Sequence, residues 1–408
     1  MNILLITIYY PPVISSLSTM MQELAEELAL RGHQVTIVTA KPQDDLNLSL
    51  EAKQKTFDTF SIEKDVRVIR VVTPPLKNKK YFLRGLVQLM LPYIFLKQIK
   101  KFVDEKIDAV IVSSPPLPLA TLGSKIKKKY RCKYILCVQD ILPQNVIDIG
   151  VMKNRLLIKF FEHVEKRAYR SSDIMTSHTQ TSRKFLIENK NVSSEKIFYI
   201  PNWIDVSSYV RDDNKPGSFR KKYNLEGKFI FLFAGVIGPA QGLDVLIRAV
   251  AEAKDIPDDI CILIVGEGSE KDRLMRMRAE YALNNIAFEP FVSLEEYPKL
   301  VKEVDAGIVC LSSLIKTPVV PGKVLGYMAS SVPVVALLNK ESDGHMIIEE
   351  AECGHSIASD ASDEEISSLI LQVYNEKDKL KQYGENGHRY VLKHFTKGNC
   401  IDSLIKLI

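Results

Sequence analysis

Short, continuously apolar runs alternate along the chain with segments whose apolar residues recur at helical spacing. The first apolar run covers residues 3–8, and residues 17–31 follow it with their apolar positions on one helical face. Strands that are buried on both faces are almost entirely apolar, and their alternation with helices is the pattern of parallel βαβ units. Further strands of this kind are predicted at residues 35–39, 109–112, 134–138, 174–176 and 197–200.

A polar stretch at residues 206–227 interrupts the alternation and predicts a linker. A second series of predicted strands follows it, at residues 229–233, 261–265, 286–288, 306–310, 332–336 and 355–358. The chain is therefore predicted to be of the α/β class, with two doubly wound, Rossmann-like domains.

The predicted boundaries are 1–205 for the N-terminal domain and 206–390 for the C-terminal domain. A polar helical stretch at 374–395 is long enough to bridge the two, and the last helix, at about 390–408, is predicted to pack back on the first domain. Ligands of doubly wound sheets bind beyond the carboxyl ends of the strands. With two such domains facing each other, the predicted site is the cleft between them.

Composition then narrows the class of protein. Of the 408 residues, 26% are charged and 46% are apolar, which excludes collagen-like, disordered and disulfide-stabilised chains. The net charge of +5 is too small to indicate nucleic acid as a partner. No Cys-x-x-Cys, zinc-type histidine spacing or Asp-x-Asp occurs, so no metal or redox site is predicted. Without a signal peptide or an apolar run of about 18 residues, a cytoplasmic chain is expected.

Two glycine-bearing loops follow predicted strands in the second half of the chain. The first carries Gly235, Gly238 and Gly242, and the second carries Gly266 and Gly268. Glycines let the backbone approach a ligand closely, and the helix that follows each loop presents its N-terminus to an anion. Each loop alone is weak evidence, but together they predict a phosphate or nucleotide site.

Lys323 falls in the first turn of a predicted helix, directly after the turn Pro321–Gly322. A cation at that end of a helix opposes the helix dipole unless an anion lies nearby. The alternative is a solvated surface lysine. The position between a Pro-Gly turn and the Gly326–Tyr327 step favours a lysine that meets an anionic ligand.

Polar residues in the first half of the chain have two interpretations each. Asp140 comes directly after a predicted strand, where it is placed to act as a base or ligand, or to cap the next helix. Ser15 and Ser16 precede a helix, where the N-terminus favours an anion, and the alternative is that Ser16 or Ser18 only caps that helix. Asn202 and Asp205 either contact a ligand or fix the turn before the linker.

Residues 76–106 combine an apolar middle, which includes Leu86 and Leu89, with a basic rim. The basic residues are Lys77, Lys79, Lys80, Arg84, Lys97, Lys100 and Lys101. This pattern predicts a pair of amphipathic helices, interrupted at Pro92, that lies on an anionic membrane. The alternative is a core helix with one solvated face.

Along nearly its whole length the sequence resembles the GT-B-fold glycosyltransferases of family 4. Within that family it is most similar to the bacterial colanic-acid and O-antigen branch, which includes N-acetyl-L-fucosamine transferases. The resemblance is carried by residues 9–12, 31–35, 139–143, 201–205, 238–242, 265–268 and 321–323.

The resemblance implies transfer of a sugar, N-acetylated or deoxy, from a UDP-sugar to a polyprenyl-diphosphate-linked sugar at the inner face of the cytoplasmic membrane. It implies a retaining reaction without metal or other cofactor, with the acceptor on the N-terminal domain near Asn202 and Asp205. Lys323 and Asp140 are the expected catalytic residues. The expected donor-binding residues are Ser15, Ser16, Gly235, Gly238, Gln241, Gly266, Phe291, Pro321, Gly322, Lys323, Gly326 and Tyr327.

The sequence also departs from the family pattern. The family's Gly-Gly in the first loop is replaced by Ser15–Ser16 here, and the arginine and lysine that clamp the diphosphate in the family are replaced by Val236 and Gln241. The family's Glu-x7-Glu pair falls at Pro318 and Gly326, and the histidine of its N-terminal domain falls at Gln139. These losses leave two other functions open. One is a UDP-sugar 2-epimerase of the same fold, and the other is a catalytically inactive nucleotide-sugar-binding partner of an assembly complex.

Overall fold

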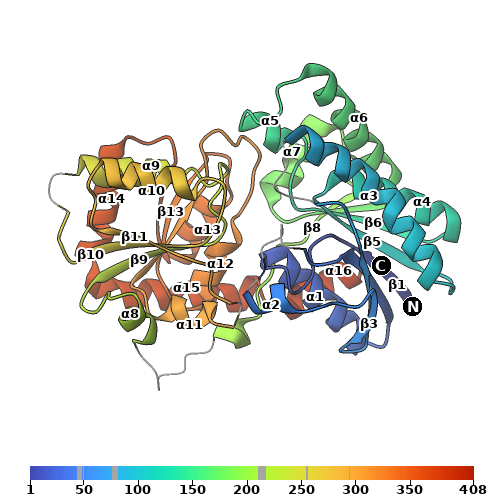
Figure 1. Cartoon of the computed structure of the whole chain (residues 1–408), viewed down its shortest axis with the longest axis horizontal. Helices are drawn as coiled ribbons and strands as arrows, with labels where there is room; N and C mark the ends of the chain where they lie inside the picture. Colours follow the sequence, from blue (N-terminus) through green and yellow to red (C-terminus); the bar gives the residue numbers. More distant parts are fainter. Residues whose placement is uncertain (44–47, 49, 76–80, 210–216, 254–255, 294) are drawn as a thin grey trace. The chain divides into compact units, whose positions relative to one another are not determined.

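The computed structural model describes the chain except for residues 44–47, 49, 76–80, 210–216, 254–255 and 294. The described chain divides into two compact units, each an α/β sandwich (Figure 1). Unit 1 comprises Met1–Asn202 with Lys397–Ile408, and unit 2 comprises Trp203–Thr396. The chain first passes from unit 1 to unit 2 after Asn202, three residues before the predicted boundary at 205, so Asp205 belongs to unit 2.

Unit 1 is built on an eight-stranded sheet in the order β3-β4-β2-β1-β5-β6-β7-β8. Its strands are β1 (Asn2–Ile6), β2 (Gln34–Ala40), β3 (Phe60–Glu63), β4 (Val66–Val71), β5 (Ala109–Ser114), β6 (Lys133–Val138), β7 (Ile174–Ser177) and β8 (Ile197–Tyr199). Its helices are α1 (Ser16–Leu30), α2 (Leu50–Gln54), α3 (Tyr81–Phe102), α4 (Ala120–Tyr130), α5 (Gln144–Asp148), α6 (Arg155–Ser171), α7 (Gln180–Lys190) and α16 (Lys397–Ile405), with a 3₁₀ turn, η1 (Leu117–Leu119). All pairings are parallel except that of β3 with β4.

Unit 2 is built on a six-stranded, parallel sheet in the order β11-β10-β9-β12-β13-β14. Its strands are β9 (Phe229–Ala234), β10 (Ile260–Val265), β11 (Ile286–Glu289), β12 (Ala306–Cys310), β13 (Val334–Leu338) and β14 (Gly354–Ala358). Its helices are α8 (Ser218–Lys222), α9 (Asp244–Glu252), α10 (Lys271–Glu280), α11 (Tyr297–Lys302), α12 (Gly322–Ala329), α13 (Gly344–Ala351), α14 (Asp363–Asn375) and α15 (Leu380–His394), with 3₁₀ turns η2 (Val206–Tyr209) and η3 (Lys377–Lys379).

Every predicted strand is present, and the apolar runs of the central strands are buried on both faces of their sheets, whereas the edge strands β8, β11 and β14 are partly exposed. In β9, for example, Ile230 and Leu232 pack into one core cluster, while Phe231 and Phe233 pack into another on the opposite face. Helices on both sides cover the two faces, as a doubly wound sheet requires. The α/β class and the two Rossmann-like domains are confirmed.

The predicted bridging helix at 374–395 is wrong. The segment is split into the end of α14, the turn η3 and α15, all in unit 2. α15 packs closely on unit 2, since a Cβ on Gly384 would lie 2.0 Å from the Ser331 carbonyl oxygen. The chain returns to unit 1 only as α16, where Arg31 pairs with Asp402 at 2.5 Å.

The predicted linker at 206–227 contains secondary structure in its described part, namely η2 and α8. The Glu303 carboxylate receives the backbone N–H groups of Phe219 and Arg220 at 2.8 and 3.0 Å, which satisfies free donors in the first turn of α8. The residues 210–216 of this linker lie outside the described part of the chain.

The predicted pair of helices interrupted at Pro92 is wrong, because α3 runs without a break from Tyr81 to Phe102. Leu91, Phe95 and Ile99 on its inner face are buried in the core of unit 1. Lys97 and Lys100 are exposed, Leu89 is partly buried, and Arg84 lies in the first turn. Lys77, Lys79 and Lys80 lie outside the described residues.

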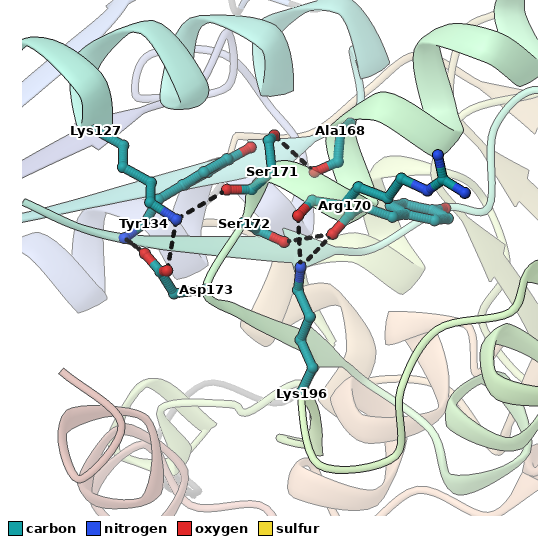
Figure 2. Close-up of polar contacts among 9 residues, drawn as sticks. Lys127, Tyr134, Ala168, Arg170, Ser171, Ser172, Asp173 and Lys196 are labelled. Carbon is teal, nitrogen blue, oxygen red and sulfur yellow. Dashed lines mark hydrogen bonds and ion pairs between the residues drawn. The ribbon is translucent and has the colours of Figure 1, made fainter.

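A polar cluster at the amino ends of β6 and β7 fixes the C-terminal end of α6 (Figure 2). Lys196 donates to the carbonyl groups of Tyr169 and Arg170, and Lys127 donates to the Ser171 carbonyl at 3.2 Å. Lys127 also pairs with Asp173 at 2.5 Å. Two ammonium groups therefore satisfy the last carbonyl groups of α6 and oppose the negative end of its dipole.

Candidate active site

The two glycine loops of unit 2 lie against each other at the carboxyl ends of β9 and β10. The Gly235 N–H donates to the Val265 carbonyl at 2.8 Å, and the Ile237 N–H donates to the Glu267 carbonyl at 2.9 Å. A Cβ on Gly266 would lie 1.8 Å from the Gly235 carbonyl oxygen. Only glycine permits this approach, so the two loops form one backbone surface of the kind that accepts a phosphate group.

Gly238 and Gln241 close the first loop on itself. The Gly238 N–H donates to the Gln241 side-chain oxygen at 3.1 Å, and the Gln241 N–H donates to the Gly238 carbonyl at 3.1 Å. The Gln241 side-chain oxygen therefore accepts the hydrogen bond of the Gly238 N–H, although the sequence analysis expected Gly238 to bind the UDP-sugar. A ligand reaches the Gly238 N–H only after this side chain has rotated away.

Lys323 lies under the first glycine loop, in the first turn of α12. Its Cε and Nζ lie 2.7 and 2.9 Å from where a Cβ on Gly235 would stand, and Nζ is 4.7 Å from the centre of the Phe233 ring. Lys323 is partly buried, and no hydrogen bond or carboxylate partner for its ammonium is found among the residues the structure describes. Burial lowers the pKa of this ammonium to about 8.

An ammonium that is taken from water without a carboxylate partner destabilises a fold, and such groups concentrate at functional sites. The N-terminus of α12 beside it also has no side-chain cap. The interpretation of Lys323 as a solvated surface lysine is therefore wrong. The ammonium, the open turn at Pro321 and Gly322, and the glycine loop form a positive site at one edge of the sheet.

The loop that leads to Lys323 is held by residues that the sequence analysis missed. The Ser342 hydroxyl donates to the Val319 carbonyl at 2.5 Å, and the buried Asn339 amide donates to the Thr317 carbonyl at 3.4 Å. The Ser312 N–H joins the same loop to the first glycine loop through the Ala240 carbonyl, at 2.9 Å. Asn339 directly follows β13 (Val334–Leu338), but the strand predicted there ended at residue 336, so its place at the strand end gave no signal in the sequence.

Tyr327, which the sequence analysis expects to bind the donor, packs its side chain into the core of unit 2. Its side chain is buried, its hydroxyl donates to the Leu232 carbonyl at 2.7 Å, and its ring fills the space beside Gly307. Gly326 is also buried, and a Cβ there would lie 3.2 Å from the Tyr297 hydroxyl. Phe291 follows β11 at the carboxyl edge of the sheet and is partly buried, so its role remains a prediction.

Two predicted ligand residues are used to fix local structure. Ser15 is the N-cap of α1, since its hydroxyl accepts the Ser18 N–H at 3.1 Å, while Ser16 is exposed in the first turn. Asp205 accepts the backbone N–H and the hydroxyl of Ser207 at 3.0 and 2.6 Å, which fixes the turn η2. For Asp205 the turn interpretation therefore holds, whereas the predicted cap at Ser16 or Ser18 is wrong, because Ser15 caps α1.

Asp140 and Asn202 are the polar residues of unit 1 that remain as candidates. Asp140 follows β6, and burial raises the pKa of its carboxyl to about 6. It does not cap α5, whose N-cap is Pro143, and its carboxylate accepts only a long hydrogen bond of 3.4 Å from Asn145 within the described chain. The side-chain oxygen of Asn202 is buried without a hydrogen-bond partner among the described residues.

Comparison with known proteins decides the class. Residues 17–208 match the family described as Glycosyltransferase Family 4, and residues 216–390 match the family described as Glycosyl transferases group 1. The fold matches the crystal structure of Anabaena Alr3699/HepE in complex with UDP-glucose, with a TM-score of 0.73 and 16% identity over 100% of both chains. The chain belongs to the GT-B glycosyltransferases.

Two curated relatives resemble this glycosyltransferase over most of its length. A protein of Escherichia coli K12 named "Putative colanic acid biosynthesis glycosyl transferase WcaI" is 24% identical over 339 residues, which is 81% of each chain. The O-antigen chain mannosyltransferase C of Escherichia coli is 18% identical over 402 residues, which is 98% of this chain and 95% of the relative.

The structure also locates the charged positions that this glycosyltransferase lacks. Val236, where the resemblance expects an arginine, is exposed on the first glycine loop. Lys271 approaches the second loop, but it is paired with Glu267 at 2.7 Å. Lys323 is therefore the cation of this part of unit 2 that is not neutralised by a carboxylate of the described chain. No cluster of His, Cys, Asp and Glu suited to a metal ion occurs among the described residues.

Proposed function

We propose that this glycosyltransferase moves a sugar from a UDP-sugar to a sugar carried on polyprenyl diphosphate, in the synthesis of a bacterial surface polysaccharide such as O-antigen or capsule. The observation that carries the proposal is the Lys323 ammonium without a carboxylate partner, under two interlocked glycine loops. The UDP-glucose bound to HepE and the names of the two curated relatives support the donor and the pathway class.

The proposed chemistry follows from the charge that develops in the reaction. As the anomeric C–O bond breaks, negative charge grows on the β-phosphate and the sugar becomes oxocarbenium-like. The Lys323 ammonium and the open N-terminus of α12 at Gly322 stabilise that charge, with the glycine backbone close to the phosphates. We propose that these groups act without a metal ion, and that the sugar keeps its anomeric configuration.

We propose that Asp140 accepts the proton of the acceptor hydroxyl. Its pKa of about 6 leaves the carboxylate ionised at pH 7 but more basic than an ordinary aspartate, as a general base requires. The acceptor sugar is held on unit 1 by Asp140 and Asn202. The two carboxylate positions of the family fall at Pro318 and Gly326, and their loss favours a donor sugar that is deoxy or N-acetylated.

Replacing Asp140 with asparagine is expected to lower kcat by about 100-fold. At pH values below about 6, wild-type kcat/KM is expected to decrease as the carboxyl becomes protonated, and the variant is expected to lack this decrease.

The stability of the same variant is a second readout. Because the pKa of Asp140 is raised in the folded state, the stabilisation from Asp140 is present at low pH and is lost as pH rises through 6. The asparagine variant should therefore melt at a higher temperature than the wild type at pH 7, and the two proteins should melt at the same temperature at pH 3. Unchanged kcat contradicts the role as base.

A lipid-linked acceptor places the proposed reaction at the inner face of the cytoplasmic membrane. No helix in the described parts of the chain is long and apolar enough to span a membrane. We therefore propose peripheral association with that membrane rather than insertion across it.

The experiment that tests the proposed function has two stages. The purified protein is first screened by thermal shift against UDP, GDP and their sugars, where a ligand at 100 times its Kd adds about 2.7 kcal/mol to stability. The UDP-sugar that stabilises the protein most is then incubated with polyprenyl-diphosphate-linked sugars. The expected product is heavier by one sugar residue, and its NMR spectrum gives the anomeric configuration.

Other results identify the alternatives. Stabilisation by UDP-sugars without transfer to any lipid-linked sugar supports the inactive binding partner, which the loss of charge at Val236 and Gln241 favours. Conversion of a UDP-sugar to its C2 epimer without acceptor supports the epimerase. Stabilisation by GDP-sugars alone overturns the UDP donor.

A further inference from the structure

An exposed apolar stripe runs along α3 in unit 1. Residues 86, 90, 93, 97 and 100 are spaced four, three, four and three apart, so they lie on one face of the helix. All five are exposed, and they are Leu86, Met90, Tyr93, Lys97 and Lys100. Leu86, Met90 and Tyr93 are 45%, 51% and 68% exposed, although the opposite face of α3 is fully packed in the core. The stripe thus places exposed apolar and aromatic side chains beside two lysines.

A second exposed stripe lies on α6, which the sequence analysis did not single out. Leu156 and Phe160, four residues apart, are 80% and 45% exposed. The other face of α6 is packed into the unit at Phe161, Glu165, Ala168 and Tyr169. Arg155 and Lys159 stand exposed beside the two apolar residues. This helix therefore repeats the arrangement of α3, with apolar side chains flanked by cations.

The two stripes approach each other at a contact between α3 and α6. α3 meets α6 where Gly85 faces Phe161, since a Cβ on Gly85 would lie 3.7 Å from the Phe161 ring. Leu86 and Phe160 are the immediate neighbours of this contact pair. The other end of α6 is fixed by Lys127 and Lys196, as Figure 2 shows. The exposed side chains are thus presented by anchored helices rather than by a loop.

The charged residues that belong to or directly flank the two apolar stripes are cationic. α3 contains no acidic residue over its 22 positions, and the first acidic residue of α6 is Glu162. Flanking cations around exposed apolar side chains complement an anionic lipid surface, where apolar groups enter the headgroup boundary. A second copy of the chain would bring like charges together, which is unfavourable.

We propose that Leu86, Met90, Tyr93, Leu156 and Phe160, named here the α3–α6 face, enter the headgroup region of an anionic bilayer. Tyr93 suits this depth, because an aromatic ring with a polar tip favours the interface, and the Lys125 ammonium lies 4.0 Å from the centre of its ring. The inference deepens the proposed function and rests on it, since a polyprenyl-linked acceptor lies in such a bilayer.

The test is cosedimentation of the full chain with vesicles of phosphatidylglycerol and phosphatidylethanolamine, compared with phosphatidylcholine vesicles. The double variant L156S/F160S is expected to bind the anionic vesicles about tenfold more weakly. The matched control is L30S, because Leu30 is 81% exposed at the end of α1. L30S is expected to bind like the wild type, and all proteins are expected to bind phosphatidylcholine weakly.

Equal binding by L156S/F160S and the wild type overturns the proposal, as does equal binding to neutral vesicles. A wild-type dimer that the double variant disrupts also overturns it, in favour of a second copy. UDP thermal shift and transfer to a water-soluble acceptor analogue are expected to be unchanged in the double variant. If the wild type fails the UDP thermal shift and the transfer assay, the proposed function is contradicted. The vesicle assay measures membrane binding alone, so its result does not depend on the outcome of those two assays.

Discussion

Replacing Lys323 with methionine is expected to lower kcat by roughly 100-fold or more, a loss of at least about 2.7 kcal/mol in transition-state stabilisation. Methionine keeps an unbranched apolar stem beside Phe233 and Gly235, so the packing under the glycine loop survives. What is lost is the positive charge that faces the leaving diphosphate. Since the ammonium has no carboxylate partner in the described chain, its removal leaves no buried anion behind.

The stability of this variant separates catalysis from structure. Burial lowers the pKa of Lys323 in the folded protein to about 8, so the charged form destabilises the fold at pH 7. The methionine variant is therefore expected to melt at the same or a higher temperature while losing activity. The matched control is K299M, at an exposed lysine of α11, which should keep wild-type kcat. Unchanged kcat in a folded K323M variant contradicts the proposed mechanism.

Replacing Gly266 with alanine is expected to abolish UDP binding and to destabilise the protein by about 3 kcal/mol. The added methyl carbon would lie 1.8 Å from the Gly235 carbonyl oxygen, which is a backbone atom and cannot rotate away. The two loops must separate to admit it, which breaks the Gly235 hydrogen bond to Val265 and moves the loop away from Lys323.

Thermal unfolding and UDP titration of G266A measure both effects. The matched control is G398A in α16, where nothing lies within 4 Å of the added Cβ and alanine is the better helix former. The control should be as stable as the wild type or more stable, with unchanged UDP affinity. Wild-type UDP affinity in G266A would show that the interlocked loops are not the phosphate site.

The strands that the sequence predicted contain no charged residue within their predicted bounds. β3 and β4 were missed because charged residues interrupt their patterns. Arg70, near the end of β4, is buried, and its guanidinium pairs with Glu63 of β3 at 2.7 Å. A buried arginine looks like a surface residue until its partner strand is known. At Pro92 the sequence predicted a helix break that does not occur, because the packed inner face of α3 keeps the helix continuous through the proline.

The parts of the candidate site that could be predicted from the sequence are the glycine loops, which need backbone freedom, and the lysine charge. Glycines after strands and a lysine at a helix start are visible in a sequence, and the structure brings Gly235, Gly266 and Lys323 together. The buried position of the Tyr327 side chain could not be predicted, because α12 is buried from Val324 to Ala329 and periodicity then identifies no ligand face. Asn339 and Ser342 were missed because they bind backbone carbonyl groups, and such contacts leave no motif.

The central claim is that the Lys323 ammonium and the glycine loops bind the diphosphate of a UDP-sugar. The most direct measurement is calorimetric titration of the protein with UDP at pH 8, in two buffers of different ionisation enthalpy. With a pKa of about 8, Lys323 is roughly half protonated before binding, and a diphosphate raises its pKa. We expect one UDP per chain with uptake of about half a proton, and an affinity that falls as the pH rises above 8. UDP binding without proton uptake, or no UDP binding at all, would contradict the claim.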